Sequence, residues 1–191
     1  MKLVNKNDQR AKISKIILLE AFENLLKKKP LNKISVTELC KEANVNRGTF
    51  YNHYLDIVDF YNDIKKDFFN IINKSVNEIT TNYINKEKEI IFNILNNIYE
   101  NKVISSIIIE LTLNQDNLKE LLNIGENKFI EYCKIHYPKK TILEYKYFYT
   151  YSSIGTLSLI SSWIKHNYDI NVDSLANELI KLNKATLNYL N

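Results

Sequence analysis

The chain has 191 residues, 45% of them hydrophobic and 25% charged, which is the composition of a soluble globular protein with one large domain or two small ones. Only 3 Gly and 2 Pro occur, and so few turn-forming residues argue against a β-rich fold and favour long helices with short connections. The net charge of +4 is unevenly distributed along the chain. Residues 1–55 carry 11 Lys and Arg against 5 Asp and Glu, whereas residues 56–191 carry 15 Lys and Arg against 17 Asp and Glu. This pattern is typical of a polyanion-binding head on a neutral body.

A first amphipathic helix is predicted from Asp8 to Lys29, because apolar residues recur there at three- and four-residue intervals. Three lysines and Pro30 end this helix, since cations suit a helix C-terminus and proline cannot continue a helix. The residues of its apolar face are Ile13, Ile16, Ile17, Ala21, Leu25 and Leu26.

A helix-turn-helix is predicted next. Ser35 opens the second helix, and Glu38 three residues later completes a capping box that satisfies two backbone N–H groups. Asn44 suits the left-handed conformation that ends many helices, and Asn46 is predicted to cap a third helix from Arg47 to about Tyr54. Two short helices joined by so short a turn have helix-turn-helix spacing.

The rest of the chain is predicted to be helical as well. Asp56 caps a fourth, longer helix, and Pro138 separates two of the later ones. The segment Asp169 to Asp173 is predicted to be a loop that ends in a cap for the last helix. The five further helices are predicted at about residues 87–100, 102–113, 115–136, 140–167 and 172–190. The fold class is therefore all-α, with about nine helices.

The segment from Ser35 to Tyr54 closely resembles the DNA-binding domain of the TetR/AcrR family of bacterial transcriptional regulators. It shares a capped helix, a turn similar to Ala-Gly-Val, and a recognition helix in which the aromatic pair Phe50-Tyr51 precedes a third aromatic residue. The flanking helices also match, so the resemblance covers about residues 10–65. The matching residues in the flanking helices are Ala21, Phe22 and Asp56.

The resemblance implies a helix-turn-helix DNA-binding domain at residues 1–55 and a helical ligand-binding and dimerisation domain at residues 56–191. It also implies a one-component transcriptional repressor that binds a palindromic operator in double-stranded DNA as a homodimer and responds to a small-molecule effector. In this hypothesis the effector reorients the two heads, so that their spacing no longer matches two major grooves.

Physical reasoning assigns roles within the head. Arg47 lies at the helix end that enters the major groove and can reach a guanine edge or a phosphate, Gly48 lets the backbone approach the DNA, and Thr49 is placed to contact a base methyl or a phosphate. The resemblance adds contacts to phosphates and groove edges. The predicted DNA-binding residues are Lys33, Thr37, Lys41, Arg47, Gly48, Thr49, Tyr51, Asn52 and His53. The predicted core residues are Val36, Leu39, Cys40, Ala43, Val45 and Phe50. Three alternatives stay open: Tyr54 as a core residue rather than a contact, His53 as a solvated surface residue, and Arg47 as a mere surface charge.

One position departs from the family pattern. The residue after Asp56 is usually a phosphate-binding Lys in the family, but here it is Ile57, with Asp59 and Asp63 nearby. Lower DNA affinity is one expected consequence, unless other lysines of the head compensate. The departure keeps a second hypothesis open, in which the chain is a coactivator or interaction protein of the same fold that acts through a partner regulator.

The resemblance places the dimer interface in the last two helices. Residues 140–191 weakly resemble the C-terminal domain of a Firmicute-type branch of the family, which includes a coactivator of dihydroxyacetone kinase expression. Small residues recur there at three- and four-residue spacing, and small side chains on one helical face let a partner helix approach closely. The alternative is a close contact inside one subunit. These residues are Ser152, Gly155, Ser158 and Ser162.

In most of the family the middle helices enclose a ligand pocket, so aromatic and aliphatic residues there are candidates. The alternative for each is ordinary core packing. The stretch Ile104 to Leu113 is apolar enough to be buried on most sides and carries no charged cluster, which favours an apolar or weakly polar effector. The candidates are Phe92, Tyr99, Ile107, Leu111, Phe129, Tyr132, Tyr147, Tyr151 and Trp163.

Catalytic and metal-binding patterns are not found. The histidines His53, His136 and His166 show no metal-ligand spacing, and no Gly-rich phosphate loop or nucleophile motif occurs, so no enzyme, metal or cofactor is expected. Cys40 and Cys133 lie at apolar positions of helical patterns and are expected to be buried, reduced thiols. With no apolar leader and no run of apolar residues long enough to span a membrane, a cytoplasmic protein is expected.

Overall fold

A computed structural model of the chain describes residues 6–77, 83–112 and 115–190. Within these ranges the backbone forms nine α-helices, one short 3-10 helix (η1) and no strand, which confirms the predicted all-α class. The helices are α1 (Lys6–Leu26), η1 (Leu31–Lys33), α2 (Val36–Glu42), α3 (Arg47–Tyr51), α4 (Ile57–Asn77), α5 (Tyr83–Glu100), α6 (Lys102–Thr112), α7 (Gln115–His136), α8 (Ile142–Lys165) and α9 (Val172–Leu187). None of the described helices is long and apolar enough to cross a membrane.

The buried face of α1 differs from the predicted one. Leu18 and Phe22 are buried together with the expected Ala21, Leu25 and Leu26. The expected Ile13, Ile16 and Ile17 are instead exposed, at 58%, 55% and 38%. The reason is the rotation of the helix, because Lys15 faces α4 and bonds to two carboxylates there. Apolar spacing fixes a period but does not choose between adjacent faces of a helix.

Local side-chain caps build the helix-turn-helix as predicted. Ser35 and Glu38 form the capping box at the start of α2. Asn44 adopts the left-handed conformation, with φ 50°. The Asn46 side chain accepts a hydrogen bond of 2.7 Å from the Gly48 N–H and starts α3. The third helix ends at Tyr51, three residues earlier than expected.

The caps of the later helices are also made by side chains. Asp56 accepts a hydrogen bond of 2.8 Å from the Asp59 N–H at the start of α4, as predicted. Before the last helix the cap is Asn171, which accepts from the Ser174 N–H, so the predicted cap at Asp173 is wrong. Asp173 lies in the first turn of α9, where a negative charge suits the helix dipole.

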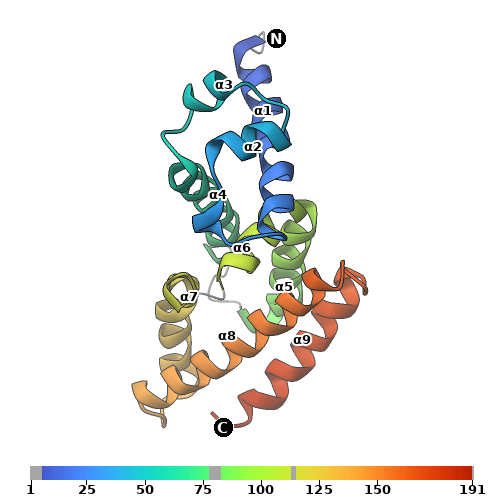
Figure 1. Cartoon of the computed structure of the whole chain (residues 1–191). Helices are drawn as coiled ribbons and strands as arrows, with labels where there is room; N and C mark the ends of the chain where they lie inside the picture. The colour runs from blue at the N-terminus through green and yellow to red at the C-terminus, as the bar shows by residue number, and fades with distance from the viewer. Residues whose placement is uncertain (1–5, 78–82, 113–114, 191) are drawn as a thin grey trace.

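Three clusters of buried side chains join the helices. The first joins α1–α3 to α4, α6 and α7, with Phe22, Phe50 and Phe60 at its centre. The second surrounds Trp163 and joins α5, α6, α8 and α9, and the third surrounds Cys133 between α7 and α8. Figure 1 shows α1–α3 at one end of the molecule and the antiparallel pair α8 and α9 at the other. Because the first cluster includes residues on both sides of residue 55, the division of the chain there stays a prediction.

Candidate nucleic-acid interface

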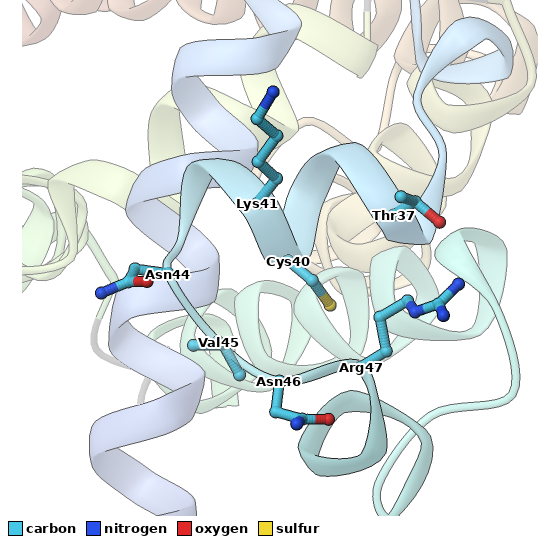
Figure 2. Close-up of a pocket in the computed structure, with 7 residues that line it drawn as sticks. All are labelled: Thr37, Cys40, Lys41, Asn44, Val45, Asn46 and Arg47. Carbon is cyan, nitrogen blue, oxygen red and sulfur yellow. The ribbon is translucent and has the colours of Figure 1, made fainter.

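An open hollow lies between α2 and α3, with a volume of about 360 Å³. Figure 2 shows Arg47 at the start of α3 and Thr37 at the start of α2 at the same end of this hollow, with Lys41 further along α2. Three of the predicted DNA-binding residues therefore line one concave surface. The lining residues are Thr37, Cys40, Lys41, Asn44, Val45, Asn46 and Arg47.

The other predicted DNA-binding residues do not line this hollow. Tyr51, Asn52 and His53 are exposed at the end of α3, as is Lys33 before α2. Thr49 is half-buried, which limits how far its side chain can reach. We refer to the hollow and the exposed residues of α3 together as the head surface. The structure thus places Thr37, Lys41 and Arg47 around one hollow, and the DNA contacts of all the predicted residues stay predictions.

Gly48 has a local reason to be glycine. A Cβ built at this position would lie 3.3 Å from Oδ1 of Asn46, the atom that caps α3. A larger residue would press on the cap that fixes the start of the recognition helix. Gly48 is also exposed, so its backbone is accessible for the close approach to DNA that is expected at this position.

Aromatic packing holds α3 in place beneath the head surface. Phe50 is completely buried, and its ring lies 5.5 Å from that of Tyr54 and 5.9 Å from that of Phe60. Tyr54 is half-buried, and its hydroxyl donates a 3.0 Å hydrogen bond to Asp63. Burial raises the pKa of Tyr54 to about 12, so its hydroxyl keeps its proton. Tyr54 therefore packs against the first core cluster, in agreement with the alternative that it is a core residue rather than a DNA contact.

A charged cluster joins α1 to α4 behind the head surface. Nζ of Lys15 lies 2.7 Å from carboxylate oxygens of both Asp63 and Asp67. Burial by itself would lower the pKa of Lys15, but the hydrogen bonds that its ammonium donates to Asp63 and Asp67 outweigh burial and raise the pKa above its usual value. Lys15 is therefore a structural cation that joins α1 to α4.

The corner between α3 and α4 contains carboxylates, whereas the family that the sequence resembles has a phosphate-binding lysine there. Ile57 is only 7% exposed and packs into the first core cluster. Asp56 and Asp59 cap the start of α4, where Asp59 accepts a 2.9 Å hydrogen bond from the Leu55 N–H. Helix N-termini bind anions through their unpaired N–H groups, but here two carboxylates already occupy that position.

Leu55 is an exposed residue of this corner that the sequence analysis did not single out. Leu55 is 83% exposed and lies in the connection that follows α3, and Val58 nearby is also exposed. No helical period marks Leu55, because it lies in the connection between α3 and α4.

The candidates for a ligand pocket do not gather around one hollow in the described part of the chain. Ile107 and Trp163 are buried in two different clusters, and Phe129 stacks on Phe148 at 5.4 Å in the third. Phe92 and Tyr132 are half-buried, Tyr99 is exposed, and the Leu111 side chain lies outside the described residues. The effector site therefore stays a prediction without a located pocket.

Tyr147 and Tyr151 lie on an outer face formed by α8 and α9. With residues of α9 they line a hollow of about 400 Å³. Several large apolar side chains of α8, of α9 and of the residues after α9 are exposed, and we refer to them together as the α8–α9 face. They are Tyr147, Tyr151, Ile154, Leu159, Leu182 and Tyr189.

Three of the four small residues predicted at the dimer interface are exposed on α8. Gly155, Ser158 and Ser162 are exposed, and Ser152 is half-buried. A Cβ at Gly155 would meet no described atom within 4 Å, so no other described helix packs on this position. At Gly155 the structure therefore does not support the alternative in which the small residues let another helix of the same subunit pack closely. The dimer itself stays a proposal.

The two cysteines are buried, and the two histidines of the C-terminal half lie on the surface. Cys40 and Cys133 are buried free thiols, and burial raises the pKa of both, that of Cys133 to about 12. His136 ends α7 and His166 follows α8, both exposed. In the described part of the chain no group of three or more His, Cys, Asp or Glu residues could hold a metal ion.

Comparison with known proteins relates the chain to transcriptional regulators by structure. No protein-family model and no curated protein sequence matches it. NalD, the secondary repressor of the MexAB-OprM multidrug efflux pump in Pseudomonas aeruginosa, has a TM-score of 0.62 and 14% identity, over 93% of this chain and 97% of its own. A TetR/AcrR-family transcriptional regulator from Aquifex aeolicus has a TM-score of 0.59 and 19% identity, over 90% of this chain and 98% of its own.

A third solved structure is an activator. The dihydroxyacetone kinase operon activator DhaS has a TM-score of 0.54 and 18% identity, over 92% of this chain and 97% of its own. Each of these similarities covers nearly the full length of both chains. The chain therefore has the fold of the TetR/AcrR transcriptional regulators.

Proposed function

We propose that this chain is a one-component transcriptional repressor that binds a palindromic operator as a homodimer and responds to a small-molecule effector. The observation that carries this proposal is the head surface, in which Arg47, Thr37 and Lys41 line one hollow at the start of a capped recognition helix. A guanidinium at the N-terminal end of such a helix suits the major groove, where it can bond a guanine edge or a phosphate.

The uneven charge supports DNA as the partner. The basic excess is confined to residues 1–55, which include the head surface, whereas the rest of the chain is slightly acidic. Phosphate neutralisation by lysine and arginine supplies much of the affinity of DNA-binding proteins. Because the head is basic and the rest of the chain is not, the head end of the molecule would face the DNA.

The α8–α9 face supports the homodimer. Large apolar side chains such as Tyr151 and Ile154 are exposed on it, beside the small residues Gly155 and Ser158. Monomeric soluble proteins rarely expose contiguous apolar patches of this kind, because apolar surface is more stable when it is removed from water. A second copy of the chain would cover the face and hold two heads at the separation that a palindrome needs.

A second candidate function is a coactivator that acts through a partner regulator. Ile57 favours it, because this residue is buried where the resembling family has a phosphate-binding lysine. The carboxylates of Asp56 and Asp59 at the same corner would repel a phosphate. In this candidate the head binds DNA weakly, and specific binding needs the partner regulator.

A gel-shift experiment separates the two candidates. The full-length protein is titrated against DNA from upstream of its own gene and against a scrambled sequence, over a range of salt concentrations. The repressor predicts a sequence-specific shift whose affinity falls steeply with salt. The absence of a specific shift at low salt, with a shift that appears only when a second regulator is added, would favour the coactivator.

Variants at the head surface sharpen the same experiment. Arg47→Ala is expected to weaken specific binding by about 1–3 kcal/mol, and Tyr51→Ala to weaken it as well, without lowering the melting temperature. Lys134→Ala is the matched control, because it removes an exposed cation from α7, far along the chain from the head. If Arg47→Ala unfolds the protein, or if Lys134→Ala weakens binding equally, the role assigned to Arg47 is wrong.

A further inference from the structure

Exposed aliphatic side chains and lysines occur together where α7 ends and α8 begins. Ile135 lies in the last turn of α7 and is 70% exposed, and Ile142 and Leu143 open α8 at 52% and 55%. Lys134 and Lys139 are exposed as well. We refer to these five residues as the α7–α8 corner. Figure 1 shows the connection between α7 and α8 at an extremity of the molecule, at the lower left, away from the head.

The charge of this segment is opposite to that of the body around it. Residues 134–146 carry 4 Lys against 1 Glu, whereas the rest of residues 56–191 carries 11 Lys against 16 Asp and Glu. Two of the four lysines have a carboxylate within reach, at 3.7 Å and 3.9 Å. Lys134 and Lys139 pair with no carboxylate of the residues that the structure describes. The corner therefore holds two cations that an external anionic surface could neutralise.

Hydrogen bonds within the segment fix the backbone of the corner. The Tyr145 hydroxyl donates a 2.6 Å hydrogen bond to the Tyr137 carbonyl, and the Tyr137 N–H donates one of 2.8 Å to the Cys133 carbonyl. Thr141 and Glu144 form a capping box that starts α8. The aliphatic side chains are thus presented on an ordered turn, so little backbone entropy is lost when they bind a surface.

Two of the three aliphatic side chains lie outside the surfaces described above. Ile135 lies two residues after the completely buried Cys133, and therefore about 200° around α7 from it. Leu143 is in line with the exposed Tyr147 four residues later, whereas Ile142 lies about 100° around α8 from Leu143. The dimer contact proposed for the α8–α9 face therefore gives no reason for the exposure of Ile135 and Ile142.

The shape and chemistry of the corner suit a lipid surface. Neither the hollow of the head surface nor that of the α8–α9 face is lined by a residue of the corner, and a projecting turn offers a peptide no groove. A flat bilayer can accept projecting side chains. Aliphatic residues that insert at the boundary of the acyl chains, with lysines beside the headgroups, bind peripheral proteins to anionic membranes.

We propose that the α7–α8 corner is a contact site for an anionic lipid bilayer, into which its three aliphatic side chains insert while Lys134 and Lys139 meet the headgroups. The contact is peripheral, since no described helix is long and apolar enough to cross a membrane. The proposal goes beyond the proposed function and does not depend on it, because no residue of the corner belongs to the head surface. A chain bound in this way keeps the head at the end away from the lipid (Figure 1).

Sedimentation with lipid vesicles tests the contact. The DNA-free, full-length protein is mixed with vesicles of phosphatidylglycerol and phosphatidylcholine, and with vesicles of phosphatidylcholine alone. The wild-type protein is expected to bind the anionic vesicles in preference to the neutral ones. Lys134→Glu combined with Lys139→Glu is expected to weaken this binding by about 10-fold or more, and Ile142→Ser by about 3- to 10-fold.

Lys165→Glu is the matched control for charge. Lys165 is an exposed lysine at the other end of α8, and its reversal is expected to leave vesicle binding close to that of the wild type. If Lys165→Glu weakens binding as much as the double substitution at the corner, net charge alone drives the binding and the proposal is overturned. An absence of binding to the anionic vesicles overturns it as well.

A tryptophan reporter separates the corner from the basic head. Trp163 is the only tryptophan of the chain and is 3% exposed, so its emission is expected to change little at a lipid surface. Ile142→Trp adds an indole at the corner, whose emission is expected to move to shorter wavelength with anionic vesicles. Ile16→Trp on α1 is the matched control without a shift, because Ile16 is exposed to a similar degree, 55% against 52%.

The reporter also distinguishes this proposal from the proposed function. If the chain binds no operator but Ile142→Trp shows the emission shift, the proposed function fails and the membrane contact stands. If the emission of Ile142→Trp is unchanged by anionic vesicles, the membrane contact fails whether or not the protein binds DNA. A shift in Ile16→Trp alone would mean that the head meets the lipid, and would overturn the proposal too.

Discussion

The head surface and the α8–α9 face differ in every chemical respect. The head surface is a polar, partly cationic hollow with Arg47 and Lys41 in its lining, set on short helices with side-chain caps. The α8–α9 face is apolar, with exposed tyrosines and aliphatic residues on two long helices. A cationic hollow suits a polyanion, whereas an apolar face suits another apolar surface. The two ends of the molecule therefore present chemically different surfaces.

The difference also lies in what determines each surface. Neighbouring residues build the head surface: Asn46 caps the helix that Arg47 begins, and Ser35 pairs with Glu38. The α8–α9 face is made by residues far apart in sequence, such as Tyr151 and Tyr189, which line one hollow only because the helices pack side by side. The following predictions test this contrast, from the largest expected effect to the smallest.

Phe50 tests whether the head surface depends on the core beneath it. Phe50→Ala removes a completely buried ring that packs against Tyr54 and Phe60, and is expected to destabilise the protein by about 3–5 kcal/mol. Chemical denaturation followed by circular dichroism measures this. Arg47→Ala, three residues earlier on the same helix but exposed, is expected to leave stability unchanged. Equal losses would mean that inward and outward positions of α3 are not distinct.

Tyr151 tests the α8–α9 face as the dimer contact. Tyr151→Asp places a charge in the centre of an apolar face, and is expected to weaken dimerisation by about 2 kcal/mol or more, as measured by sedimentation equilibrium. Operator affinity is expected to fall with it, because the two heads are then no longer linked. Ile135→Asp, an exposed apolar residue of α7, is the control and should leave the dimer intact. A monomeric wild-type chain would contradict the prediction directly.

Asp56 tests the acidic corner of the head. Asp56→Asn keeps a side chain that caps α4 but removes a negative charge, so operator affinity is expected to rise by about 2- to 5-fold at low salt and less at high salt. Asp173→Asn, in the first turn of α9, is the matched control and should have no effect. An unchanged affinity in Asp56→Asn would mean that the corner does not approach DNA.

The cluster of Lys15, Asp63 and Asp67 predicts a small effect of pH on the head. Burial by itself would raise the pKa of Asp63, but the hydrogen bond and charge of Lys15 lower it below its usual value. A carboxylate with a lowered folded-state pKa contributes stability that is present above its unfolded-state pKa and is lost as pH falls through the folded-state pKa. Because the Asp63 side chain is 37% exposed, solvent screening limits the contribution to a few tenths of a kcal/mol, as for other exposed ion pairs.

Melting curves in acid measure that contribution. The wild-type protein is expected to lose melting temperature more steeply below about pH 4 than Lys15→Met, in which the carboxylate has lost its partner. Lys12→Met removes an exposed lysine from the same helix and is expected to follow the wild type. If all three proteins lose stability in parallel, the cluster does not contribute.

Sequence reasoning went furthest where structure is local. The capping box at Ser35 and Glu38, the left-handed Asn44 and the cap at Asn46 were all predictable, because each depends on residues within a few positions of one another. It failed at Ile13, which was expected on the packed face of α1 and is exposed. Periodicity could not show that Lys15 is turned inward by carboxylates of α4, some fifty residues away.

By itself, then, the sequence determined that the chain is all-helical, where its helix-turn-helix begins, and which side chains lie around the start of the recognition helix. Only the tertiary structure decided that Ile57 is buried and that Tyr147 and Tyr189 line one hollow. The physical reason is the range of the forces involved. Caps and helical periods act over one or two turns of chain, whereas burial and contacts between distant helices depend on how every helix packs against the others.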